Sequence, residues 1–99
     1  MSVAGNWHLV LDSPMGEQKA AVELEEEDGE LTGVLTNLGN NISSEIFDGE
    51  VDGNDLTWKI KLKQLRLTLA FTLTRADDRV QGKVKAGLFG SFDVSGQRQ

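Results

Sequence analysis

The sequence has no cysteine and no tyrosine, one proline and one histidine. Without cysteine, the chain has neither a disulfide framework nor a thiolate that binds a metal or acts as a nucleophile. Its apolar stretches are short and interrupted by charge, and its first residues lack the basic and then apolar design of a signal peptide. We therefore expect no membrane-spanning helix, and we expect a cytoplasmic protein or a module of a longer chain.

Charge is unevenly divided along the chain, although the formal net charge is only −6. Residues 1–50 contain one lysine and 11 acidic residues, whereas residues 51–99 contain nine basic and five acidic residues. The basic residues alternate with apolar ones and have no aromatic side chains on the same face, so this face offers nothing for nucleobases to stack on. We expect no nucleic-acid partner.

Alternation of apolar and polar residues predicts β-strands along most of the chain. From Leu56 the sequence reads LTWKIKLK, and from Leu65 it reads LRLTLAFTLT, so each strand has one apolar and one solvated face. Asp-Gly and Asp-Asp pairs at 28–29, 48–49, 52–53 and 77–78 are typical of hairpin turns. The predicted strands are residues 5–12, 18–26, 30–37, 42–48, 55–63, 65–75, 79–86 and 91–98.

Eight strands in simple order, without helices, leave two exposed sheet edges unless the first strand pairs with the last. We therefore expect residues 1–99 to form one domain, an all-β, eight-stranded antiparallel up-and-down barrel. A β-sandwich of two sheets is the alternative. Bulky residues such as Trp58 and small ones such as Gly82 both face inward, so the sequence leaves open whether the interior is filled or holds a cavity.

Three residues give the chain a family resemblance. Gly5-x-Trp7 lies early in the first predicted strand, and Arg98 lies at the end of the last. This pairing resembles the signature of the calycins, the superfamily of lipocalins, fatty-acid-binding proteins and avidins, in which the tryptophan sits at the closed end of the barrel and the arginine packs across it. The resemblance implies that Gly5, Trp7 and Arg98 form a structural plug. The chain has no counterpart of the ligand-binding tyrosine of avidins, so biotin is not an expected ligand.

A larger part of the chain resembles a bacterial module of similar length. The segments DGELTG, VDGNDLTW, GLFGSF and SGQR are similar to small bacterial proteins of unknown role and to the tails of some amidohydrolase-like enzymes. This second resemblance implies a fold and a bacterial source but no activity.

If the strands run up and down, one set of connections gathers at the end opposite Trp7. These connections are residues 13–17, 37–41, 63–65 and 86–90, and apolar side chains lie at their tips. Such a set is typical of a ligand mouth or a protein contact. The candidate mouth and cavity wall consist of Met15, Leu35, Leu38, Ser44, Leu62, Leu67, Val84, Leu88, Phe89 and Phe92.

Two functional hypotheses follow. In the first, the protein is a calycin-like barrel that binds a small apolar or amphipathic ligand at its mouth. In the second, Leu88 and Phe89 fold back over a filled core, and the protein is a non-catalytic interaction or stabilising module, acting as a homo-oligomer or as an accessory to an enzyme.

Catalysis has little support in the sequence. His8 alternates with Trp7 and Leu9, so it should face outward, and no serine or threonine has an evident inward base. We expect no catalytic residue, no cofactor and no metal site.

Overall fold

The computed structural model describes residues 3–14, 16–63 and 66–99. Predicted site residue Met15 and residues 64–65 of the predicted strands and connections lie outside the described residues. The described elements are β1 (Gly5–Ser13), β2 (Gly16–Glu27), β3 (Glu30–Asn37), β4 (Ser43–Glu45), β5 (Phe47–Asp52), β6 (Asp55–Leu62), β7 (Leu67–Ala76), β8 (Arg79–Lys85), the 3₁₀ turn η1 (Gly87–Phe89) and β9 (Ser91–Arg98).

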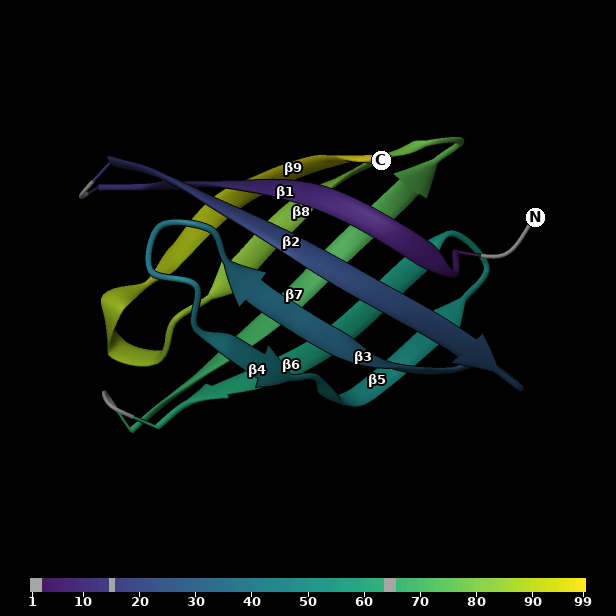
Figure 1. Cartoon of the computed structure of the whole chain (residues 1–99), viewed down its shortest axis with the longest axis horizontal. Coiled ribbons are helices and arrows are strands. Elements are labelled where there is room, and N and C mark those ends of the chain that lie inside the picture. The colour runs from purple at the N-terminus through teal and green to yellow at the C-terminus, as the bar shows by residue number, and fades with distance from the viewer. Residues whose placement is uncertain (1–2, 15, 64–65) are drawn as a thin grey trace.

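The strands form one antiparallel sheet that closes on itself (Figure 1). Its order is β2-β1-β9-β8-β7-β6-β5-β3-β4, and a further pairing of β2 with β3 completes the ring. β4 and β5 share one position between β3 and β6, so the barrel has eight strand positions. The first strand pairs with the last, as in Trp7 with Arg98. The prediction of a closed up-and-down barrel is confirmed, and the sandwich alternative is wrong.

The predicted strand 42–48 and the predicted turn at Asp48-Gly49 are wrong in detail. The strand is interrupted at Ile46, and its second part continues to Asp52. Asp48 has a φ of 51° but forms a β-bulge within β5 rather than a hairpin turn, because the pairing with β6 shifts register between Phe47 and Glu50. A bulge bends its strand, and this one brings Gly49 so close to the backbone of Leu31 that no Cβ would fit.

The two ends of the barrel differ in their connections. At the terminal end, on the right of Figure 1, lie both chain termini and the tight β2–β3, β5–β6 and β7–β8 turns. At the loop end, on the left, lie the end of β1, the start of β2, the end of β6, the start of β7, and the β3–β4 and β8–β9 connections. No helix in the described part of the chain is long and apolar enough to cross a membrane.

Alternate residues of each strand fill the interior. The largest side chains with almost no exposure are Trp7, Trp58, Phe71, Leu9, Leu24, Leu31, Leu56, Ile60 and Leu73. Gly82 and Gly96 occupy inward positions in β8 and β9, and a Cβ at either would collide with the neighbouring strand. Glycine therefore lets the strands approach closely and bend, as closure of a small barrel requires.

Candidate functional site

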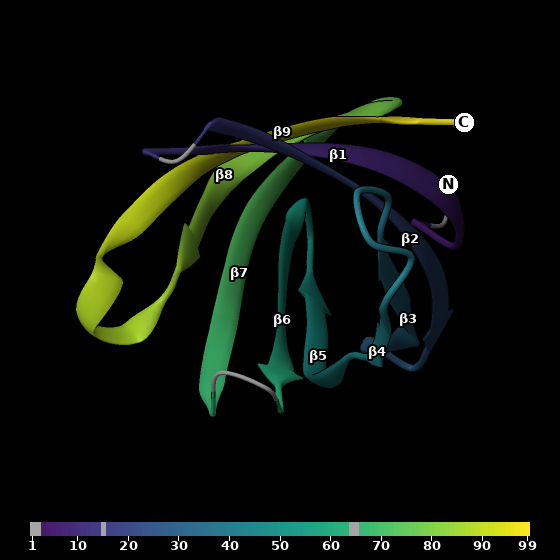
Figure 2. The same cartoon turned by 60° about the vertical axis from the view of Figure 1, so that its left-hand side comes forward.

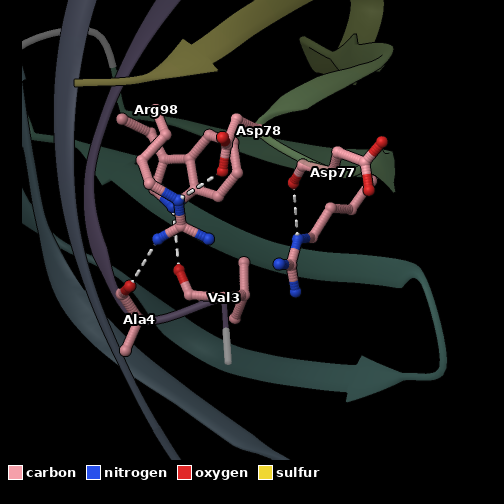
Figure 3. Close-up of polar contacts among 7 residues, drawn as sticks. Val3, Ala4, Asp77, Asp78 and Arg98 are labelled. Carbon is pink, nitrogen blue, oxygen red and sulfur yellow. Dashed lines mark hydrogen bonds and ion pairs between the residues drawn. The ribbon is translucent and has the colours of Figure 1, made fainter. Parts of the chain in front are cut away.

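The terminal end is closed by the side chain of Trp7. Trp7 is 1% exposed, and its Nε1 donates a hydrogen bond of 2.8 Å to the carbonyl oxygen of Val3. The guanidinium carbon of Arg98 lies 4.5 Å from the centroid of the Trp7 ring, within the range of a cation–π contact. Arg98 Nη1 donates to the carbonyl oxygen of Ala4 at 2.7 Å, and Nε donates to Asp78 Oδ1 at 3.0 Å (Figure 3). The arginine therefore ties the first strand to the last across the tryptophan.

Gly5 explains the first position of the Gly-x-Trp motif. Its φ is 130°, a backbone conformation that side-chain-bearing residues rarely adopt, and a Cβ would lie 3.0 Å from Arg98 Nη1. A glycine here leaves room for the guanidinium to reach the Trp7 ring. The structure thus brings together Gly5, Trp7 and Arg98, the three residues of the predicted plug.

Inward-facing apolar side chains are less buried at the loop end. Four partly buried residues that pack against the core lie there: Leu11, Leu62, Leu69 and Phe92. Leu67, paired with Leu62, is also half-buried. A further residue of this kind, Val51, lies toward the terminal end. The loop end therefore presents a group of partly buried apolar side chains, hereafter the cup, defined by Leu11, Leu62, Leu67, Leu69 and Phe92.

Polar side chains occupy the opposite side of the cup. Directly paired residues of antiparallel strands face the same side of the sheet. Gln18 is paired with inward-facing Leu11, Asn37 with Ala20 and Ser44 with Leu35. Gln18 is exposed, whereas Asn37 and Ser44 are half-buried. β2, β3 and β4 thus supply amide and hydroxyl groups, and β6, β7 and β9 supply leucine and phenylalanine.

The predicted wall residues divide between the cup and the core. Ser44, Leu62, Leu67 and Phe92 lie at the cup, whereas Leu35 and Val84 are buried beneath it, with exposures of 6% and 1%. Gln18 and Asn37 were not predicted, because the predicted wall consists of apolar residues with Ser44 as its one polar member. Gln18 lies two residues before Ala20, and Asn37 lies two residues after Leu35. Strand alternation therefore predicts that both side chains face inward.

The predicted loop-tip residues do not cover the barrel. Leu88 is fully exposed and Phe89 is 73% exposed. Figures 1 and 2 show the β8–β9 connection that carries them swinging outward from the barrel wall. Leu38 is 43% exposed in the β3–β4 connection. The alternative in which Leu88 and Phe89 fold back as a lid is therefore wrong.

The outer wall carries two shallow, open depressions, both crossing β1, β9, β8 and β7. His8 lines one of them together with Thr74, Gln81 and Ser95, so it faces outward as its place in the strand predicts. Within the described ranges, no three histidine, cysteine, aspartate or glutamate side chains are grouped to hold a metal ion. The depressions combine hydroxyl and amide groups with charged side chains, among them Asp12, Lys83 and Asp93.

Comparisons with known proteins identify the fold. No family model and no curated protein matches the chain. A solved structure described as the de novo design of a fluorescence-activating β-barrel has a TM-score of 0.71 and 19% sequence identity to this chain. The match covers 97% of this chain and 93% of the designed one. At this identity the likeness concerns the fold alone, and the protein is a small antiparallel β-barrel.

Proposed function

We propose that this protein is a non-catalytic binding protein whose cup accepts a small apolar or amphipathic molecule. The observation that carries the proposal is the contrast between the two ends. Trp7 and Arg98 close the terminal end with hydrogen bonds and a ring contact. At the loop end, leucine and phenylalanine side chains point inward and remain half-buried.

The cup offers a ligand a modest free energy of binding. Burial of apolar surface contributes about 25 cal/mol per Å², so each ~100 Å² of apolar surface that a ligand covers contributes about 2.5 kcal/mol. Gln18, Ser44 and the amide N–H groups of Asn37 favour an amphipathic molecule over a pure hydrocarbon, because they offer hydrogen bonds on one side. The Oδ1 of Asn37 already accepts a hydrogen bond from Gly39 N at 2.8 Å. The resemblance of Gly5, Trp7 and Arg98 to the calycin signature supports the same orientation, since in calycins the tryptophan marks the closed end.

The first test is native mass spectrometry of freshly purified protein, followed by denaturing extraction of whatever accompanies it. A reproducible additional mass per chain would support the proposal and identify the chemical class. The second test is titration with a fluorescent apolar probe, 1-anilinonaphthalene-8-sulfonate. Leu67→Glu should weaken probe binding by placing a charge in the cup, whereas Leu88→Glu, a matched change on the exposed η1 turn, should not. Equal binding to both variants, or none to the unmodified protein, would refute the proposal.

A second candidate function is a non-catalytic interaction module, a homo-oligomer or an accessory to an enzyme. The observation that favours it is the exposure of Leu88 and Phe89 together on one turn that reaches away from the barrel. Sedimentation equilibrium over a wide range of protein concentration tests self-association. A discrete oligomer that Leu88→Ser and Phe89→Ser convert to monomer would support this function, and a monomer at all concentrations would exclude the homo-oligomer.

A further inference from the structure

Trp58 lies in the barrel interior, below the cup. It occupies an inward position of β6, two residues before Ile60 and four before Leu62. Phe71 on β7 is its direct partner, and the two rings are stacked with centroids 5.3 Å apart and planes 21° apart. Both side chains are 1% exposed.

The indole N–H of Trp58 has no hydrogen-bond acceptor in the described structure. Its Nε1 is buried without a partner among the described residues. An indole is a donor only, so it has no alternative way to satisfy the group. Trp7 provides the internal comparison, because it is equally buried and its Nε1 donates to Val3 O at 2.8 Å. A buried donor without an acceptor destabilises the folded state.

The surroundings of Trp58 supply no polar side chain to accept this hydrogen bond. The described residues that are buried are all apolar, and Nε1 has no described backbone carbonyl as a hydrogen-bond partner either. Successive inward positions connect this donor to the cup, through Ile60 and Leu62 on β6 and through Leu69 and Leu67 on β7. Ile60 is buried and the three leucines are half-buried, so an acceptor supplied from outside the chain reaches Nε1 when these side chains move apart.

We propose that Trp58 is the polar anchor of an interior binding site, and that its ligand carries a neutral carbonyl oxygen that accepts a hydrogen bond from Nε1. This inference rests on the proposed function. The ligand's acceptor is neutral rather than a carboxylate, because no charged residue is buried among the described residues to balance a buried negative charge. The rest of the ligand is apolar and contacts the leucines of the cup.

Two probes of similar shape test the anchor. 2-Acetylnaphthalene has a carbonyl oxygen, whereas 2-isopropylnaphthalene replaces it with a methyl group. The dissociation constants of both probes are measured for the unmodified protein and for Trp58→Phe, which keeps an aromatic ring but lacks the donor. A net hydrogen bond corresponds to about three- to tenfold in affinity. We expect the preference for the acetyl probe to fall by this factor in Trp58→Phe, and binding of the isopropyl probe to change less.

NMR signals of the indole N–H groups in the ¹⁵N-labelled unmodified protein provide a second readout. This readout does not depend on whether the variant binds a probe. The two buried tryptophans give two indole signals, which Trp58→Phe assigns. On addition of 2-acetylnaphthalene, the Trp58 indole proton should move downfield. The Trp7 signal should stay in place, because its donor is already bonded to Val3. The isopropyl probe should not produce the downfield shift.

The outcomes separate failure of the anchor from failure of the proposed function. If both probes bind with the same relative affinity to the two proteins and the Trp58 signal does not move downfield, the anchor is refuted while the binding function stands. If neither probe binds the unmodified protein, the binding function fails and the anchor fails with it. A cross-peak between the Trp58 indole proton and water that persists after the acetyl probe binds would assign the acceptor to a resident water and also refute the anchor.

Discussion

Arg98→Ala is the substitution that most directly tests how the terminal end is closed. The variant removes the contact with the Trp7 ring at 4.5 Å and the hydrogen bond to Ala4 O at 2.7 Å. A cation–π contact contributes about 0.5–2 kcal/mol, depending on its exposure. A hydrogen bond from a charged donor contributes about 1.5–3 kcal/mol. The ion pair with Asp78 adds little, because that carboxylate is 66% exposed.

The two contributions are not additive, because a single guanidinium makes both contacts. The side chain of Arg98 is 21% exposed, so its contacts are only partly screened by water. We therefore expect Arg98→Ala to lower the free energy of unfolding by about 2–3 kcal/mol. In a domain of this size, that loss lowers the Tm by roughly 10–20 °C.

The assay is urea denaturation followed by tryptophan fluorescence and far-ultraviolet circular dichroism, with Arg79→Ala as the control. Arg79 lies at the same end of the adjacent strand, paired with Gln97, and is exposed. Its removal should change stability by no more than about 0.5 kcal/mol. If the two variants lose the same small amount, then Arg98 does not hold the two ends of the chain together and the description of the closed end is wrong.

The remaining predictions concern backbone spacing and the exposed turn. Gly82→Ala should prevent folding or destabilise the barrel by several kcal/mol, because its Cβ would collide with the Thr72 carbonyl. Gly39→Ala should cost less, since its Cβ meets only the flexible Asn37 side chain at 3.1 Å; thermal denaturation compares the two variants. Leu88→Ser and Phe89→Ser should each change the free energy of unfolding by no more than about 0.5 kcal/mol in urea titrations, because neither side chain packs against the core. A larger loss would mean that the η1 turn supports the fold.

Most strands could be predicted from the sequence because each carries its own signal. The alternation from Leu56 onward and the Asp28-Gly29 pair, whose φ values are 52° and 81°, act through neighbouring residues alone. The closure of the sheet into a barrel could be predicted because unpaired sheet edges are unfavourable in any all-β protein. No single residue encodes it. These local and general causes explain why the order of the strands was right and why the predicted limits outside residues 42–52 lie within two residues of the observed ones.

The bulge at Asp48-Gly49 could not be predicted because the same dipeptide serves two structures. Asp28 and Asp48 have almost the same φ, 52° and 51°. At 28–29 the chain reverses between β2 and β3, whereas at 48–49 the strand continues and Gly49 packs against Leu31 of β3. Whether Asp48-Gly49 forms a turn or a bulge depends on packing against Leu31, 18 positions earlier in the chain. Local turn preferences do not include such a contact.

The direction of the β8–β9 connection was also beyond the sequence pattern. Leu88 and Phe89 were assigned to the mouth because their connection carries apolar side chains and lies at the end opposite Trp7. In the structure, positive φ values of 58° at Gly87 and 89° at Gly90 accompany a turn that leaves both side chains in solvent. Glycine accepts several backbone conformations at similar cost, so its presence predicts a turn but not the direction in which the turn points. The polar side of the cup, in contrast, could have been predicted from the sequence, because strand alternation alone places Gln18 and Asn37 on the inward face.

The two tryptophans show why packing alone does not account for the interior. Both are 1% exposed and both lie within the same barrel. At position 7, the indole N–H contributes a hydrogen bond that fixes the residues preceding β1. At position 58, a phenylalanine would stack on Phe71 and fill much of the same volume without burying an unpaired donor. The stability of the ligand-free barrel therefore gives no reason for an indole at this position. A ligand that supplies the missing acceptor does give one, because the donor that destabilises the empty barrel would then contribute to affinity and selectivity.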